Sequence, residues 1–181
     1  MMNIMGITIR EYRHTDETAT MAVFRRSITG LASRDYDDKQ VRVWAAHTGS
    51  AGEWNNRRMA VHTWIAEWID DELADAGDVA DCEAAEDAAC RSRPLMGFID
   101  VDDVGYIDML FVDSVYSCRG VASVLLDLVE RFAQDAGIAR LTVHASITAR
   151  PFFLRHEFHT VAPLCPMISD VAFTNYLMAR P

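Results

Sequence analysis

The chain has 181 residues, half of them hydrophobic, and a formal net charge of −10. This length and composition are typical of one soluble domain that has a hydrophobic core of its own. No run of eighteen or more apolar residues occurs, which is the length that crosses a bilayer, and the first residues, MMNIMGITIREY, show no leader pattern. We therefore expect a single cytoplasmic domain over residues 1–181 with no membrane partner.

Cysteine spacing gives no sign of a metal site. The four cysteines are Cys82, Cys90, Cys118 and Cys165, and they lack the close pairing of zinc sites. A disulfide framework is also a poor interpretation, so we expect reduced thiols and no metal.

The negative charge is concentrated in one segment. Residues 70–90 hold nine acidic residues and no basic one, so the rest of the chain sums to −1. We interpret residues 70–93 as an acidic insert between the second and third predicted strands. Such a segment disfavours nucleic acid nearby, and no basic, aromatic-interleaved stripe elsewhere indicates a nucleic-acid partner. The insert is also a candidate docking arm for a basic protein partner.

The predicted elements follow one another without an internal repeat or linker. A half-buried strand at Ile7–Tyr12 precedes a helix that begins near Thr15, and a second short helix begins at Asp37 or Asp38. The segment EWNNRRMA is a candidate helical turn before a strand at His62–Ile69. The remaining predicted elements are two strands joined by a tight turn at Asp102–Gly105, a long helix ending near Gly137, the strand LTVHA, a helix over ITARPFFLRHEF, and two final strands in HTVAPLCP and VAFTNYLMA. We expect an α+β fold with a mixed sheet of six to seven strands and about four helices.

Residues 105–132, GYIDMLFVDSVYSCRGVASVLLDLVERF, carry the strongest functional signal. An apolar strand ends at Val112, a turn contains Arg119 and Gly120, and apolar residues then recur at helical spacing. A helix start presents unpaired backbone N–H groups and a partial positive charge, which together suit an anionic ligand such as a diphosphate. An ordinary glycine turn before a buried helix is the alternative interpretation.

The order of elements and four sequence blocks resemble the GNAT superfamily of N-acetyltransferases. Leu110 and Val112 match its L-x-V strand, and the turn that follows matches its Q/R-x-x-G-x-G/A motif except at Ser117. Similarity to the YafP-like branch lies in IDMLFVD, RGVAS, ASITARPFF and FTNYLM, and more weakly in RDYDDKQVRVWA. A lone R-G-x-A would be a weak signal, but four blocks in the right order identify the family.

The resemblance implies a site for acetyl-CoA. The pantetheine arm would pair with the backbone of the strand, and the pyrophosphate would be bound by the turn and the first amides of the helix. The implied cofactor contacts are Leu110, Phe111, Val112, Cys118, Arg119, Gly120, Val121, Ala122, Ser123, Ser146, Phe152 and Phe153.

Catalytic candidates are less evident. Asp108 is a carboxylate in an otherwise apolar strand, where an unpaired charge costs several kcal/mol, so it is either a general base or a member of a salt bridge or exposed strand end. The family commonly has a tyrosine acid at the position of Phe153, a glycine at Glu157 and an asparagine at Ser146. The candidate donors that remain are Cys118, Ser117, His144 and Tyr176, besides water and backbone dipoles.

On the acceptor side, the resemblance suggests that Tyr36 and Trp44 shape the pocket, although both aromatic residues also suit a structural role. Asn175 and Thr174 either pair with backbone at the last strands or face the acceptor. We predict an acetyl-CoA-dependent N-acetyltransferase that acts on an amine of a small molecule or protein by direct attack, and a homodimer is compatible with this. The alternative is a non-catalytic acyl-CoA-binding or regulatory module, because Phe153 has no proton to donate.

Overall fold

The computed structural model describes residues 3–4, 6–69 and 93–181. Apart from Arg93, the predicted acidic insert at 70–93 therefore lies outside the described residues. The order of the predicted helices and strands matches the structure, while several of their ends differ by a few residues. The prediction of one mixed sheet with six to seven strands and about four helices differs from the structure, because the described strands form sheets of five and four strands and a two-stranded hairpin, and the described residues form five α-helices.

Two β-sheets make up most of the described fold. The first runs in the order β1 (Asn3–Ile4), β2 (Ile7–Glu11), β3 (His62–Trp68), β4 (Leu95–Val101) and β6 (Leu110–Val112), and all neighbours are antiparallel. The second runs β5 (Tyr106–Ile107), β7 (Leu141–Ser146), β11 (Asn175–Arg180) and β8 (His159–Leu164), and its β5–β7 pair is parallel. A hairpin of β9 (Met167–Ile168) and β10 (Val171–Ala172) completes the strands that the structure describes.

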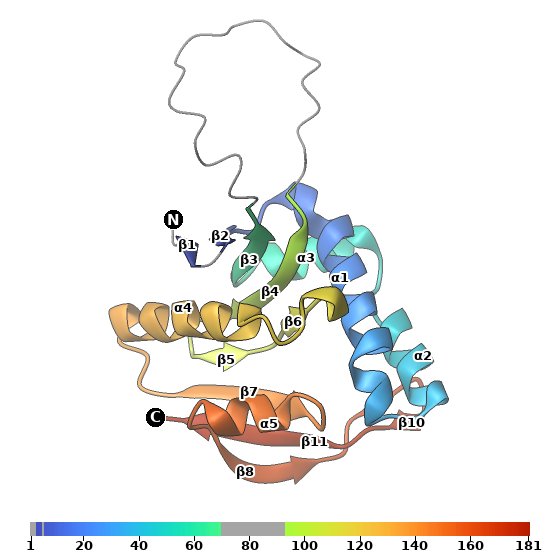
Figure 1. Cartoon of the computed structure of the whole chain (residues 1–181). Coiled ribbons are helices and arrows are strands. Elements are labelled where there is room, and N and C mark those ends of the chain that lie inside the picture. The colour runs from blue at the N-terminus through green and yellow to red at the C-terminus, as the bar shows by residue number, and fades with distance from the viewer. Residues whose placement is uncertain (1–2, 5, 70–92) are drawn as a thin grey trace, which may run out of the picture.

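The predicted strand through Val112 is therefore not continuous. Its first part, β5, belongs to the second sheet and its last part, β6, belongs to the first, with Asp108 and Met109 between them. The sheets part at this point (Figure 1).

Among the described residues, five α-helices are present: α1 (Glu17–Gly30), α2 (Asp38–Ala46), α3 (Ala51–Met59), α4 (Val121–Ala136) and α5 (Arg150–Arg155). The segment EWNNRRMA forms part of α3 because Ser50 and Glu53 cap its start reciprocally: the Ser50 hydroxyl accepts from Glu53 N at 3.2 Å, and Glu53 Oε2 accepts from Ser50 N at 2.8 Å. No helix in this part of the chain is long and apolar enough to cross a membrane.

The helices cover the sheets so that two hydrophobic clusters form. On one face of the first sheet, α4 packs against Ile99 and Val101, and the same cluster continues under the second sheet. On the other face, α1 and α3 enclose Phe98 together with the fully buried Trp54. Figure 1 shows α4 between the two sheets, with its N-terminus next to β6.

A glycine allows this close packing of α4. A Cβ atom on Gly97 of β4 would lie 2.8 Å from Phe111 O of β6 and 3.2 Å from Val121 Cγ1 at the start of α4. Contacts this short require the strand and the helix to move apart. The small size of residue 97 is thus a condition for the position of the N-terminus of α4.

We expect Gly97→Ala to lower the free energy of unfolding by about 1–3 kcal/mol through overpacking, measured by urea denaturation. Gly52→Ala is the matched control, because a Cβ atom there meets nothing within 4 Å and the position is helical. We expect that control to be neutral or stabilising by up to about 1 kcal/mol. Equal stability of the Gly97 variant and wild type would contradict the packing argument.

Candidate active site

The open edge of β6 is the first component of the site. Asp100 N donates to Met109 O at 3.0 Å and Asp113 N donates to Met96 O at 2.8 Å. Because antiparallel strands alternate the direction of their backbone groups, Phe111 also faces β4, whereas Leu110 and Val112 direct their N–H and C=O groups away from it. β6 is the last strand of its sheet. Two residues therefore present backbone groups at an open edge, as a strand-like ligand requires.

The start of α4 is the second component. Gly120 has a φ of +81° and precedes the first helical residue, and the first helical backbone bond runs from Val124 N to Gly120 O at 3.0 Å. Within the described structure, no backbone carbonyl accepts from the N–H groups of residues 118–123. A Cβ atom on Gly120 would meet nothing within 4 Å, so the space above this turn is open.

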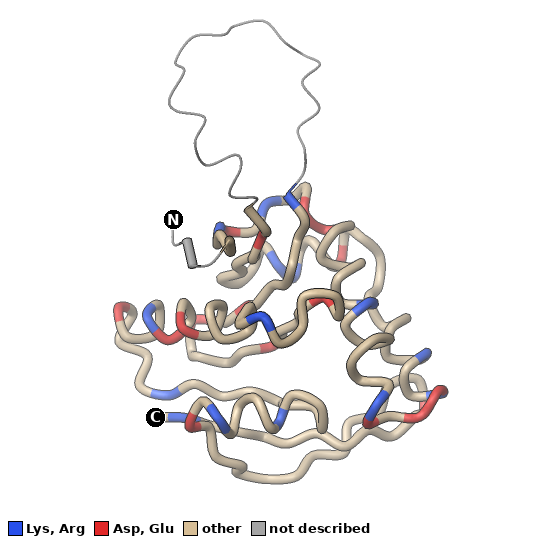
Figure 2. Tube along the Cα trace, in the orientation of Figure 1, with Lys and Arg blue, Asp and Glu red and all other residues tan. Residues whose placement is uncertain are grey.

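Charge near this helix start suits an anion. The first turn of α4 carries no acidic residue, and the acidic residues of the helix occur from Asp127 onward, which Figure 2 shows as red segments away from the end next to β6. Arg119 is exposed, with its guanidinium carbon 5.7 Å from the centre of the Tyr116 ring. The turn before it is anchored by the buried Asp113, whose carboxylate accepts from Arg26 Nε at 2.5 Å and from Val115 N at 3.2 Å.

A buried ion pair is the third component. Asp100 of β4 is fully buried and Arg58 of α3 is 2% exposed, and Arg58 Nε lies 2.8 Å from Asp100 Oδ2. This contact is close but not directed as a hydrogen bond, since neither atom meets hydrogen-bond geometry. Asp100 Oδ1 accepts from Met109 N at 2.8 Å, and Arg58 Nη2 lies 3.3 Å from Asp108 Oδ2. The Asp108 carboxylate thus has both features of the second alternative considered from the sequence: it lies beside a cation, and its side chain is 53% exposed.

An aromatic cluster lies on the face of β6 opposite α4. Phe111 contacts Trp44 and Phe24 with ring centres 6.3 and 4.7 Å apart, and Tyr36 and Phe173 complete the group. The Tyr36 hydroxyl donates to Thr174 O and accepts from Ile147 N, both at 3.0 Å. Burial raises the pKa of this hydroxyl, which keeps its proton for Thr174. Tyr36 thus ties the α1–α2 connection to the ends of β7 and β11.

The second sheet carries the candidate proton donors. Tyr176 of β11 is half-buried, with the Arg150 guanidinium 4.4 Å above its ring centre. His144 of β7 is exposed on the other face, in edge contact with Tyr106. Asn175 pairs with Ser146 in the sheet, and the Ser146 hydroxyl accepts from Ala149 N at 3.1 Å.

The helix-α5 candidates lie differently. Phe153 is 1% exposed and packs against Phe158 and Phe152, so it is a core residue, while Phe152 is half-buried beside His156.

The exposed Cys118 has a φ of +59° within the turn before α4. In the described residues, no group of three His, Cys, Asp or Glu side chains is placed to hold a metal ion.

Sequence reasoning missed Arg58, Asp100 and Phe173. Asp100 carried the same signal as Asp108, a single carboxylate in an apolar strand. Arg58 had no such signal, because only the packing of α3 against β4, through contact of Trp54 with Phe98, brings it to the strand.

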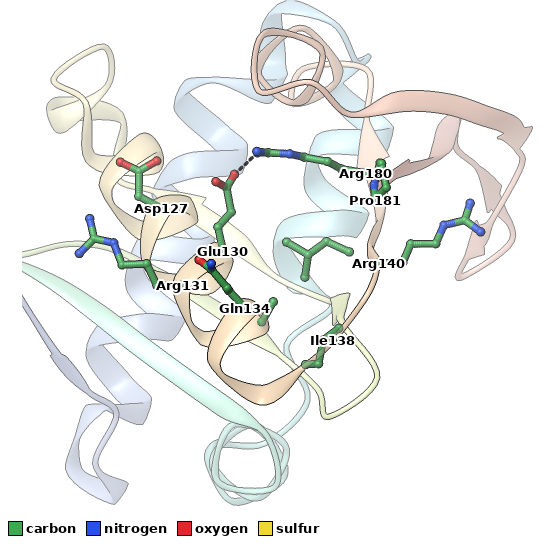
Figure 3. Close-up of a pocket in the computed structure, with 10 residues that line it drawn as sticks. Asp127, Glu130, Arg131, Gln134, Ile138, Arg140, Arg180 and Pro181 are labelled. Atoms are coloured by element: carbon green, nitrogen blue, oxygen red, sulfur yellow. Dashed lines mark hydrogen bonds and ion pairs between the residues drawn. The ribbon is translucent and has the colours of Figure 1, made fainter.

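One pocket of the described structure lies away from these components. It has a volume of about 500 Å³ and lies at the other end of α4, between that helix, the start of β7 and the end of β11. Figure 3 shows its mixed charges, with Arg180 paired to Glu130. We do not place the chemistry there, because no open strand edge or helix N-terminus faces it.

Comparisons with known proteins agree with this geometry. The family model for the acetyltransferase (GNAT) domain matches residues 32–167. An uncharacterized N-acetyltransferase, YafP of Escherichia coli K12, is 34% identical over 96% of this chain and 95% of its own length. The structure of a GCN5-related N-acetyltransferase from Rhodopseudomonas palustris superposes with a TM-score of 0.79 at 25% identity, covering 99% of this chain and 98% of the other. The PaiA N-acetyltransferase of Thermoplasma acidophilum, solved in complex with coenzyme A, has a TM-score of 0.67 at 16% identity over 97% and 99% of the two chains.

The buried carboxyl of Asp100 gives a prediction about stability and pH. Burial raises its pKa from the ordinary 3.8 to about 7, against the opposing charge of Arg58. Since this folded pKa lies above that of the unfolded chain, the folded protein binds the proton more tightly, and this group lowers the free energy of unfolding as pH rises from about 4 to about 7.

Asp100→Asn removes that titration. We expect the difference in free energy of unfolding, wild type minus Asp100→Asn, to fall as pH is raised through this range in urea titrations. Asp135→Asn, at an exposed position of α4, is the control and should show no such trend. A difference that rises with pH would mean that Arg58 keeps the carboxyl ionised, and it would contradict the prediction.

Proposed function

The chain belongs to the GNAT acetyltransferase family, a family of N-acetyltransferases, and we propose that it transfers the acetyl group of acetyl-CoA to an amine. One observation carries the proposal: strand 106–112 changes sheet immediately before a helix whose start is open and suited to an anion. That combination offers an open strand edge, a gap between sheets and a diphosphate site in the right order along one stretch of chain.

The residues present fit coenzyme A at the start of α4. The unpaired amides of residues 118–123 would bind the pyrophosphate, and the Arg119 side chain would add positive charge. Gly120 leaves the space that the phosphates require. On the open edge of β6, Leu110 and Val112 would pair with the amides of the pantetheine arm, while the backbone groups of Phe111 face β4. This refines the predicted set, in which all three residues had the same role.

Acetyl-CoA supplies a thioester, whose carbonyl carbon forms a bond to the acceptor nitrogen as its bond to sulfur breaks. The nitrogen loses a proton in this step, and the thiolate gains one. We assign Asp108 as the proton acceptor, directly or through water, because its carboxylate is half-exposed at the point where the sheets part. Arg58 Nη2 donates to Asp108 Oδ2 at 3.3 Å, which fixes the position of this carboxylate.

The proton for the thiolate has a less direct source. Phe153 occupies the position of the family tyrosine and is buried in the core. Tyr176 is the donor we favour, since it is a half-buried hydroxyl-bearing residue on the second sheet and the Arg150 guanidinium lies 4.4 Å from its ring centre. His144 lies on the outer face of β7 and Ser117 and Cys118 lie in the turn, which makes them weaker candidates.

The acceptor would approach from the aromatic side of β6. Trp44 and Phe111 are partly exposed there, and Tyr36 holds the neighbouring connection in place. Asn175, at the start of β11, lies at the end of the second sheet to which Tyr36 is hydrogen-bonded. The acceptor is an amine of a small molecule or an exposed amino group of a protein.

The role of Asp108 is tested by Asp108→Asn in an assay that follows release of free thiol from acetyl-CoA with a panel of amines. We expect kcat to fall by about 10²-fold or more, with the Kd for acetyl-CoA unchanged. Asp103→Asn, whose carboxylate is 92% exposed on the same hairpin, is the control and should retain full turnover. Tight acetyl-CoA binding by the wild type without thiol release for any acceptor would favour a non-catalytic binding module.

The phosphate site is tested by Gly120→Glu. A side chain at φ +81° is strained and its carboxylate would repel the diphosphate, so we expect the Kd for acetyl-CoA, measured by calorimetry, to rise about tenfold or more. Gly137→Ala at the other end of α4 is the control, because Gly137 also has a positive φ, +71°, and equally open surroundings. If both variants bind acetyl-CoA like wild type, the site is elsewhere.

A further inference from the structure

The Arg58 guanidinium is divided among three groups at the strand change. Its Nε lies 2.8 Å from Asp100 Oδ2, its Nη1 contacts Met109 Sδ, and its Nη2 lies 3.3 Å from Asp108 Oδ2. Its carbon Cζ lies 5.0 Å from the centre of the Trp54 ring. Two nitrogens of this buried cation thus contact the residues at which the chain passes from one sheet to the other, and the third lies beside Asp100 of β4.

Asp100 holds the same point from β4. Its carboxylate accepts from Met109 N at 2.8 Å, and its own N–H donates to Met109 O at 3.0 Å. Both backbone polar groups of Met109 are therefore bound to one residue. The residues on the N-terminal side of Asp108, in strand β5, pair with β7 instead. Asp100 is the last residue of β4 that holds this stretch in the first sheet before the partner changes.

Stability alone does not explain such a pair. Burying an arginine and an aspartate costs several kcal/mol per ion, and well-packed hydrophobic residues of similar volume often give equal or greater stability. The pair does, however, impose a geometry that hydrophobic residues would not impose. It places the backbone of Met109 and directs the Asp108 carboxylate to a cation while leaving 53% of that side chain exposed.

We propose that Arg58 and Asp100 are positioning residues for acetyl transfer. They hold the Asp108–Met109 junction at which the sheets part, and they orient the Asp108 carboxylate toward the acceptor. This inference rests on the proposed function, in which Asp108 accepts the proton. Neither residue contacts the acceptor or the thioester in this scheme, so each acts through Asp108.

The test uses Arg58→Met, Arg58→Lys and Asp100→Asn in the full chain, each first checked for folding by thermal unfolding. We expect Arg58→Met and Asp100→Asn to lower kcat by about 10-fold to 100-fold, because a small displacement of a reacting group has an effect of this size. The Kd for acetyl-CoA should stay within about threefold, since the phosphate site lies on α4. Arg58→Lys keeps the charge but not the fork of donors, so it should recover only part of kcat.

The decisive measurement is a double-mutant cycle with Asp108→Asn. If Arg58 acts through Asp108, Arg58→Met lowers kcat far less in the Asp108→Asn background than in the wild type. Asp16→Asn is the control: Asp16 is 10% exposed and paired at 2.7 Å with Arg10 of β2, a strand that β3 and β4 separate from β6. It removes a similar ion pair and should leave kcat unchanged in folded protein.

A second readout does not depend on catalysis. Hydrogen exchange of the peptide that spans residues 106–113 should be faster in Arg58→Met and Asp100→Asn than in wild type, and unchanged in Asp16→Asn. Additive losses in the double-mutant cycle, or exchange at 106–113 that matches wild type, would overturn the inference. Absence of transfer by the wild type would contradict the proposed function, and the exchange experiment would still decide whether the pair holds the junction.

Discussion

One stretch of chain belongs to two sheets, and the rest of the site depends on that constraint. Tyr106–Ile107 bonds to β7 and Leu110–Val112 bonds to β4, so the sheets must separate at Asp108 and Met109. Backbone polar groups that lose their strand partner where two sheets separate would ordinarily lower stability, because buried polar groups need hydrogen-bond partners. Here Asp100 satisfies both groups of Met109. The edge of β6 beyond it is open, and our proposal places the pantetheine arm there.

Helix α4 follows from the same arrangement. Eight residues, 113–120, separate its start from the end of β6 at Val112, and they include the anchored turn of Asp113. Because Gly97 allows Val121 to approach β4 closely, the helix start lies beside the open edge. Its unpaired amides and the absence of acidic residues in its first turn make it the positive end of the site. The packing of α4 against β4, rather than the intervening loop, thus holds the helix start beside the strand edge.

The two hydrophobic clusters lie on opposite faces of the first sheet, and these faces correspond to the proposed cofactor and acceptor sides. Leu110 and Val112 pack toward α4, on the side where the cofactor would bind, and Phe111 packs toward Trp44 and Phe24, on the side where the acceptor would approach. The alternation of side chains along a strand is sufficient to send neighbouring residues to opposite faces. The Arg58–Asp100 pair lies on the proposed acceptor side, next to Trp54, and contacts Asp108 and Met109 at the junction.

The sequence by itself determined the family, the order of the elements and the turn that leads into α4, because these depend on neighbouring residues. The clearest case is Gly137, which was predicted to end the long helix and has a φ of +71° at the C-terminus of α4. The tertiary structure alone decided that strand 106–112 divides between two sheets, since hydrophobic alternation describes a strand without naming its partner. It also decided that Phe153 is core and that Arg58 meets Asp100 and Asp108, because a long-range ion pair arises from packing of α3 against β4 and leaves no periodic trace along the chain.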